Sequence, residues 1–123
     1  MLPRGSVDDY ELARSAAQSS LDLEPDYQPT VNTLGVALYY VGEYELSIET
    51  LERSVKLRTD DTTSLYDDFY LSMSYWKLGN RDRAKHYFDR AIRVMEPDNE
   101  EHTRIREEAV ELMQAQPILE SSH

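Results

Sequence analysis

Residues 34–57, LGVALYYVGEYELSIETLERSVKL, and residues 71–94, LSMSYWKLGNRDRAKHYFDRAIRV, decide the fold. The two stretches superpose at a displacement of 37 positions, where small residues fall on small ones and large residues fall on large ones. The matched pairs are Leu34 with Leu71, Gly35 with Ser72, Leu38 with Tyr75, Gly42 with Gly79, Ser47 with Ala84, Leu51 with Phe88, and Ser54 with Ala91. Self-similarity at a fixed period of roughly 20–50 residues indicates a repeat architecture.

A third copy of the pattern lies upstream, but only its second half is present. Tyr10 stands 34 positions before Tyr44. At the same displacement Ala13 matches Ser47, Ala17 matches Leu51, Ser20 matches Ser54, and Leu23 matches Leu57. The two complete copies are displaced by 37 positions, three more than the displacement of 34 to the half copy. The three extra residues fall in the polar stretch 58–64.

Helical periodicity and punctuation predict six helices. Apolar residues recur at spacings of three and four through 84–95, as on one face of a helix. Gly42 and Gly79 fall where a helix must stop and reverse, and Pro29 is tolerated near a helix start. The predicted helices cover about 8–23, 29–41, 44–57, 64–78, 81–95 and 99–115.

The order of Leu-Gly, a large residue, a turn glycine, and small–large–small positions resembles the tetratricopeptide repeat over residues 8–98. The resemblance implies an all-α fold, a superhelix of antiparallel helix pairs within a single domain at 8–116. Its predicted parts are a half repeat at 8–27, repeats at 28–61 and 65–98, and a capping helix at 99–116. Residues 1–7 are interpreted as a tag or linker remnant, and 117–123 as a tail.

The departures from the family pattern are small. Ser47 and Ser54 replace alanines, Ser72 replaces a glycine, and no proline closes the first complete repeat. The two repeat stretches are also similar to C-terminal segments of large bacterial signalling proteins that contain a Ser/Thr kinase or a WD40-type propeller. That resemblance implies that this chain is a piece of a longer signalling protein.

Two sets of residues follow from the repeat. Helices approach closely only where side chains are small, with large residues filling the grooves between them. The predicted packing positions are Leu34, Gly35, Leu38, Ser47, Leu51, Ser54, Leu71, Ser72, Tyr75, Ala84, Phe88 and Ala91. The resemblance further implies a concave partner-binding groove lined by Asn32, Val36, Tyr39, Tyr40, Phe69, Met73, Trp76 and Lys77.

Alternatives remain open for the groove. Aromatic residues in helices are often core residues, and Trp76 could equally pack under the last helix. A clamp of Lys, Asn and Arg for a C-terminal carboxylate is poorly matched, because Val36, Phe69 and Met73 are apolar. An apolar or amphipathic peptide suits the predicted surface better, since aromatic side chains are favoured as binding anchors.

Composition excludes several classes of function. The net charge of −11 disfavours nucleic acid and membrane surfaces as partners. With no cysteine and no metal-ligand spacing, we expect no metal site, and four glycines provide no phosphate-binding loop. We therefore expect a cytoplasmic, non-catalytic protein without cofactors whose partner is a protein or peptide.

Charge is unevenly distributed along the chain. Residues 8–52 contain ten acids and one base, whereas residues 77–93 contain six bases and two acids. Solvated helix faces account for such runs. The alternative is self-association, including a homodimer, through the N-terminal helix that lacks its partner helix.

Overall fold

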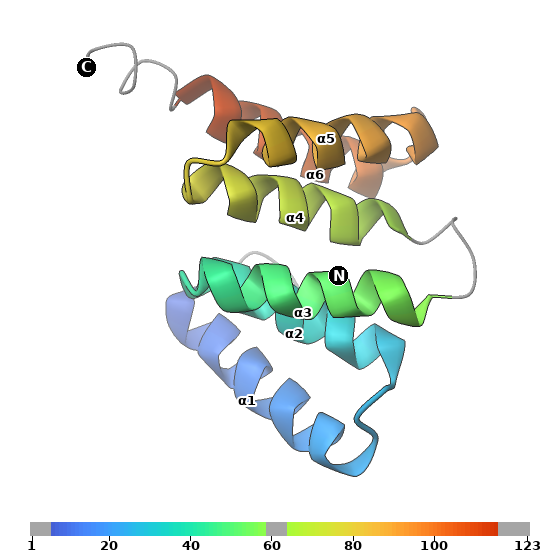
Figure 1. The fold of residues 1–123 in the computed structure, drawn as a ribbon. Helices are drawn as coiled ribbons and strands as arrows, with labels where there is room; N and C mark the ends of the chain where they lie inside the picture. Colours follow the sequence, from blue (N-terminus) through green and yellow to red (C-terminus); the bar gives the residue numbers. More distant parts are fainter. Residues whose placement is uncertain (1–5, 59–63, 116–123) are drawn as a thin grey trace.

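The residues that the structure describes, 6–58 and 64–115 of a computed structural model, form six α-helices (Figure 1). The helices are α1 (Val7–Leu23), α2 (Gln28–Tyr40), α3 (Tyr44–Leu57), α4 (Ser64–Lys77), α5 (Arg81–Val94) and α6 (Glu100–Ala115). Each agrees with its predicted range to within one residue at either end. The helices pack as adjacent antiparallel pairs, so the predicted all-α helical-repeat fold is confirmed.

The first helix begins earlier than predicted. Ser6 caps α1 by accepting a hydrogen bond from the backbone N–H of Asp9, and the Asp9 carboxylate accepts one from the N–H of Ser6. This reciprocal capping box satisfies backbone donors that a helix start leaves unpaired. Val7 is therefore the first residue of α1 and Ser6 is its cap, although both fall in the range interpreted from the sequence as a tag or linker remnant. Residues 1–5 and 116–123 lie outside the described residues. These ranges contain the rest of the predicted linker remnant, the end of the predicted capping helix and the predicted tail.

Both reversals within the repeats depend on glycine. Gly42 and Gly79 have φ angles of 89° and 85°, a left-handed conformation that residues with a Cβ rarely adopt. After the second reversal, the Asn80 side chain accepts a hydrogen bond from the N–H of Arg83 and caps α5. Each turn therefore returns the chain antiparallel to the helix before it.

Helices of one pair approach most closely at one matched position in each repeat. A Cβ at Gly35 would stand 2.5 Å from Cδ2 of Leu51, so α2 and α3 meet in contact there. The Ser47 hydroxyl donates to the Gly35 carbonyl at 2.7 Å. In the next pair the Ser72 hydroxyl donates to the Ala84 carbonyl, also at 2.7 Å.

The pairs stack side by side. We call α2 and α4 the first helices and α1, α3 and α5 the second helices; α2 contacts α1, α3 and α4, and α4 contacts α3, α5 and α6. In Figure 1, α1 lies at one end of the stack, and α5 and α6 lie at the other. No helix within 6–58 and 64–115 is long and apolar enough to cross a membrane.

Candidate functional site

The structure buries half of the residues predicted to line a groove. Val36, Tyr39, Phe69 and Met73 are at most 8% exposed and belong to the main hydrophobic core. Tyr39 packs against Tyr70, with ring centroids 5.6 Å apart, because α2 and α4 contact each other directly. These four side chains therefore join helices within the fold, which corrects the expectation that they face a partner.

Tyr40, another predicted groove residue, is half-buried at a junction of four helices. Its ring stacks on Tyr10 of α1 at 4.3 Å, and its hydroxyl lies 2.8 Å from that of Tyr70 in α4. The same hydroxyl donates to the Glu108 carboxylate of α6 at 2.8–2.9 Å. Burial and then the neighbouring Tyr70 and Glu108 raise the pKa of Tyr40, so the hydroxyl stays protonated and able to donate.

Asn32, also predicted for the groove, takes part in a polar cluster between α2, α3 and α4. Its amide donates to Asp67 at 2.5 Å, and the same carboxylate accepts from Ser54 at 3.0 Å and from Arg58 at 2.6 Å. Asp67 is fully buried, and Arg58 is nearly so. These donors offset only part of the effect of burial, which on balance raises the pKa of Asp67. The cluster links α2, α3 and α4 through this one carboxylate.

Asp68 lacks such compensation. It is 1% exposed, and neither carboxylate oxygen has a hydrogen-bond partner within the described ranges. The nearest cation is Arg90, whose Nε lies 3.5 Å from Oδ2. Burial raises the pKa of Asp68 to about 6, against the opposing effect of Arg90.

Of the residues predicted to line a groove, Trp76 and Lys77 remain accessible. Trp76 is half-buried, and the guanidinium of Arg81 lies 4.3 Å from its ring centroid. The indole Nε1 is buried and has no hydrogen-bond partner in the described part of the chain. Lys77 is exposed next to it, with its Nζ 5.9 Å from the ring centroid of Tyr44. We call Trp76, Lys77 and Arg81 the tryptophan patch.

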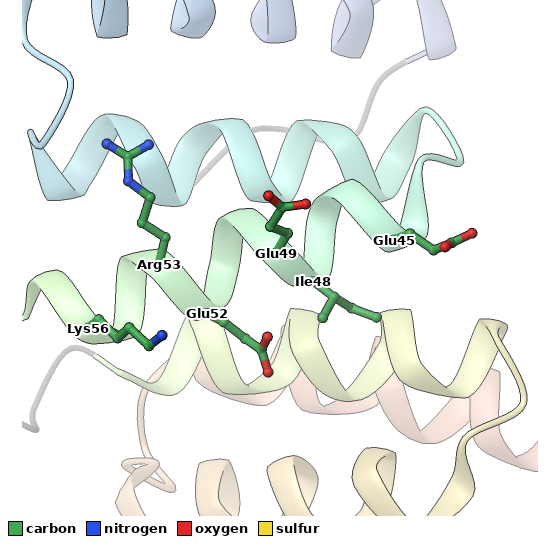
Figure 2. Close-up of a pocket in the computed structure, with 6 residues that line it drawn as sticks. All are labelled: Glu45, Ile48, Glu49, Glu52, Arg53 and Lys56. Atoms are coloured by element: carbon green, nitrogen blue, oxygen red, sulfur yellow. The ribbon is translucent and has the colours of Figure 1, made fainter.

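A surface that the sequence reasoning did not find runs along α3. A hollow of about 420 Å³ lies along this surface and is lined by residues of α3. Figure 2 shows its side chains, which carry both charges and project from this single helix. The lining residues are Glu45, Ile48, Glu49, Glu52, Arg53 and Lys56. The signal was present in the sequence as charges on the face of α3 opposite the packing positions Ser47, Leu51 and Ser54.

Glu52 links this hollow to α5. Its carboxylate accepts hydrogen bonds from Tyr75 at 3.1 Å and from Tyr87 at 3.3 Å, and the two rings lie parallel with centroids 5.7 Å apart. Burial and then the Glu52 carboxylate raise the pKa of Tyr75 to about 12. A second hollow of about 210 Å³ opens beside this pair, between α3 and α5. The carboxylate of Glu52 is thus already occupied by the fold.

A third hollow, of about 320 Å³, lies between α1 and α2. It is lined by Ala13, Ala16, Ala17, Ser20, Thr30 and Thr33. Unlike the hollow on α3, its lining contains no charged side chain. We call it the α1–α2 groove.

The predicted packing positions lie between the helices. Tyr75 and Phe88 are partly buried, and the other ten are buried. Phe88 packs against Phe69 with ring centroids 5.8 Å apart. These residues therefore position the helices, while the accessible chemistry lies in the tryptophan patch and in the hollows.

No group of three or more His, Cys, Asp or Glu side chains in the described ranges is arranged to hold a metal ion. Residues 71–94, which span the second half of α4 and all of α5, match the family described as tetratricopeptide repeat. No curated protein matches the chain. Such a repeat implies a module for protein–protein interaction in general.

Proposed function

We propose that this chain binds a segment of another polypeptide at the tryptophan patch, where α4 ends and α5 begins. The proposal rests on the tetratricopeptide match at 71–94, which includes Trp76, Lys77 and Arg81. One observation carries the choice of surface: the half-buried indole of Trp76 lies 4.3 Å from the Arg81 guanidinium and next to the exposed Lys77. Tryptophan and arginine are the residues most enriched at the energetic centres of interfaces.

The chemistry of the patch indicates the kind of segment it would accept. The exposed ammonium of Lys77 would attract an acidic side chain of the bound segment. The accessible surface of the indole ring would contact an aliphatic or aromatic side chain. We therefore propose an extended or helical peptide with an apolar anchor next to an acidic group.

Trp76 is the only tryptophan in the sequence, so its fluorescence reports on this patch alone. Peptides selected from a random display library on the immobilised protein should shift the Trp76 emission on binding. Lys77→Glu should weaken those peptides several-fold, because it reverses the charge beside the indole. Lys85→Glu, an equal change at an exposed position of α5, serves as the control. Peptides that leave Trp76 emission unchanged and bind the Lys77 variant equally would refute the proposal.

Self-association through α1 is a second candidate function. Leu12 and Leu23 are 70% and 85% exposed on this helix, and an exposed apolar face favours burial against a partner. Light scattering behind size exclusion tests this candidate across a range of concentrations. A dimer that dissociates when Leu12 and Leu23 are both changed to Ser supports it, and a monomer throughout contradicts it.

As part of the same proposal, the module is non-catalytic and serves a larger cytoplasmic signalling protein. The tetratricopeptide match supports the non-catalytic part, because such repeats are usually non-catalytic, and the resemblance of the two repeat stretches to segments of signalling proteins motivates the rest. Assay of the longer chain with and without residues 7–115 tests it, because removal should change partner recruitment and leave any chemical step intact.

A further inference from the structure

Helix α6 does not take the position that the repeat would give it. Each first helix packs against the second helix before it, since α2 contacts α1 and α4 contacts α3. In Figure 1, α6 lies behind α5, but it packs mainly on α4. A hollow of about 450 Å³ opens between α5 and α6, lined by Ile92, Met95, Pro97, Thr103 and Arg106. The last helix therefore lies against the first helices instead of continuing the stack.

Tyrosines of the first helices form the surface that α6 contacts. Tyr66 of α4 donates to Glu101 at 3.0 Å, and Tyr40 of α2 donates to Glu108 at 2.8–2.9 Å. The ring centroids of Tyr40 and Tyr70 lie 5.6 Å apart, and their hydroxyls lie 2.8 Å apart. We call Tyr40, Tyr66 and Tyr70 the tyrosine platform.

The hydroxyls of the platform are protonated donors. Burial and then the hydrogen bond to Glu101 raise the pKa of Tyr66 to about 12. Burial also raises the pKa of Tyr40 and of Tyr70. At neutral pH the three tyrosines therefore keep their protons, and a carboxylate is the acceptor that forms the strongest hydrogen bonds with them.

The face of α6 that meets the platform has a defined chemistry. Glu101 and Glu108 are seven residues apart, or about two helical turns, so both lie on the same side of the helix. Ile105 and Ala109 lie on that side too and belong to the main core. The face that fits the platform thus combines two carboxylates with one aliphatic and one small side chain.

The attachment of α6 is narrow. Only Ile105 and Ala109 are buried on this helix, whereas seven residues of α2 are buried. The connection from α5 is exposed at 96–98, and the Asn99 side chain caps α6 by accepting from the N–H groups of Glu101 and His102. A helix with its own cap, few buried contacts and an exposed connection opens at a lower free energy than the whole fold.

We infer that the tyrosine platform is a second polypeptide-binding site, which α6 occupies as an internal ligand. The partner it accepts is an amphipathic helix of another protein that repeats the chemistry of the α6 face. That helix carries two glutamates seven residues apart, with an aliphatic residue between them and a small residue beside the second. It replaces α6 on α2 and α4, so binding and release of α6 are coupled. This site shares no residue with the tryptophan patch.

A labelled peptide of residues 98–115 serves as the probe, because its sequence fits the platform within the chain. Fluorescence anisotropy measures its binding to the full chain. The wild-type chain should bind weakly, since its own α6 competes. Ile105→Ser in the chain withdraws the main apolar contact of α6 and should tighten binding at least about tenfold. Val110→Ser, a matched change at a partly exposed position, should bind as the wild type does.

A second loosened chain covers the case in which Ile105→Ser does not fold, as judged by circular dichroism. Glu101→Gln with Glu108→Gln retains the apolar face of α6 and removes its two charged acceptors. This chain should bind the wild-type probe at least about threefold more tightly than the unaltered chain. Equal binding by the unaltered chain and by every folded loosened chain would overturn the inference.

The same pair of glutamates is tested on the probe. A peptide with Glu101→Gln and Glu108→Gln should bind a loosened chain at least about fivefold more weakly than the original peptide. A peptide with Glu107→Gln and Glu111→Gln makes the same change of charge at exposed positions and should stay within about twofold. Equal losses for the two peptides would contradict recognition by the tyrosine hydroxyls.

Hydrogen exchange and the oligomeric state complete the test. Amides of α6 in the wild-type chain should exchange faster than those of α4, and exchange of both helices only through global unfolding would overturn the inference. A dimer of the loosened chain would also overturn it, because a second copy would then fill the platform. Lys77→Glu should leave probe binding within about twofold while it weakens ligands of the tryptophan patch. Either site can thus fail while the other stands.

Discussion

At the scale of single residues, Gly35 and Leu51 decide how closely the helices α2 and α3 can approach. Gly35 leaves no room for a methyl group, since its added Cβ would lie 2.5 Å from Cδ2 and 2.6 Å from Cγ of Leu51. Leu51 is fully buried, so it cannot move aside without displacing other core side chains. The small residue is thus a requirement of the contact between α2 and α3.

We expect Gly35→Ala to lower the free energy of unfolding by about 1–3 kcal/mol through overpacking, despite the better helix propensity of alanine. Urea denaturation measures the change. Leu51→Ala alone should destabilise by creating a cavity, and the double variant should cost less than the sum of the two, because each change relieves the other. Additive effects would contradict the contact.

Asp68 gives a prediction for pH. Its pKa is raised from 3.8 to about 6 in the folded protein, so folding favours the protonated form. The stability it contributes is present below about pH 4 and is lost as the pH rises through 6. Asp68→Asn should therefore stabilise the protein by about 1–3 kcal/mol above pH 6, and the gain should vanish towards pH 4. Urea unfolding of both proteins at several pH values checks this; a gain independent of pH would contradict it.

At the scale of helices, α6 packs Ile105 and Ala109 into the main core and is also joined by hydrogen bonds from two tyrosines. Tyr40 reaches it through Glu108, and Tyr66 reaches it through Glu101 at 3.0 Å. The first contact is part-buried and shared with Tyr70, whereas the second is exposed. Hydrogen bonds to a charged acceptor contribute more when water is excluded, so the Tyr40 contact should dominate.

Tyr40→Phe retains the ring stacked on Tyr10 and removes only the hydroxyl. We expect a loss of about 1–3 kcal/mol and faster amide hydrogen exchange in α6, because Glu108 and Tyr70 each lose a partner. Tyr66→Phe is the matched control and should change the exchange of α6 little. Equal effects of the two variants would show that the buried network does not hold the helix.

The sequence was enough to predict where the helices begin and end. It was not enough to predict which helices contact one another. Gly42 and Gly79 stand where the chain reverses, because the turn requires a positive φ angle that glycine adopts readily. The helix ends could therefore be predicted closely. The sequence also placed Val36 and Phe69 on their helices. It did not indicate which neighbouring helix would cover these two side chains. Burial there results from contact between α2 and α4, and the link from Tyr40 to Glu108 joins residues 68 positions apart. Neither contact leaves a periodic signal.

At the scale of the whole molecule, the acidic excess acts on the folded state as a unit. With a net charge of −11 over 123 residues, repulsion among surface carboxylates opposes compaction. The buried ion pair of Arg58 and Asp67, with an N···O distance of 2.6 Å, is screened far less than the surface charges. Added salt should therefore relieve the repulsion while leaving this pair intact.

Raising the NaCl concentration from about 20 mM to about 500 mM, where the Debye length falls below 10 Å, should raise the urea midpoint. Arg58→Met tests the buried pair separately, because it should destabilise at both salt concentrations by leaving Asp67 without its cation. A midpoint that falls with salt would mean that attractive surface pairs outweigh the acidic repulsion.

The hydroxyls at the two helix crossings have a consequence for how such a chain can be inherited. Ser47 donates across one crossing from the second helix, and Ser72 donates across the other from the first. A recombination event that joined α2 to α5 would set Gly35 against Ala84, with no hydroxyl at the crossing. The reciprocal product would set Ser72 against Ser47 and crowd two hydroxyls into one contact. We therefore expect an exchange of whole helix pairs to keep one hydroxyl at each crossing, and an exchange within a pair to lose that arrangement.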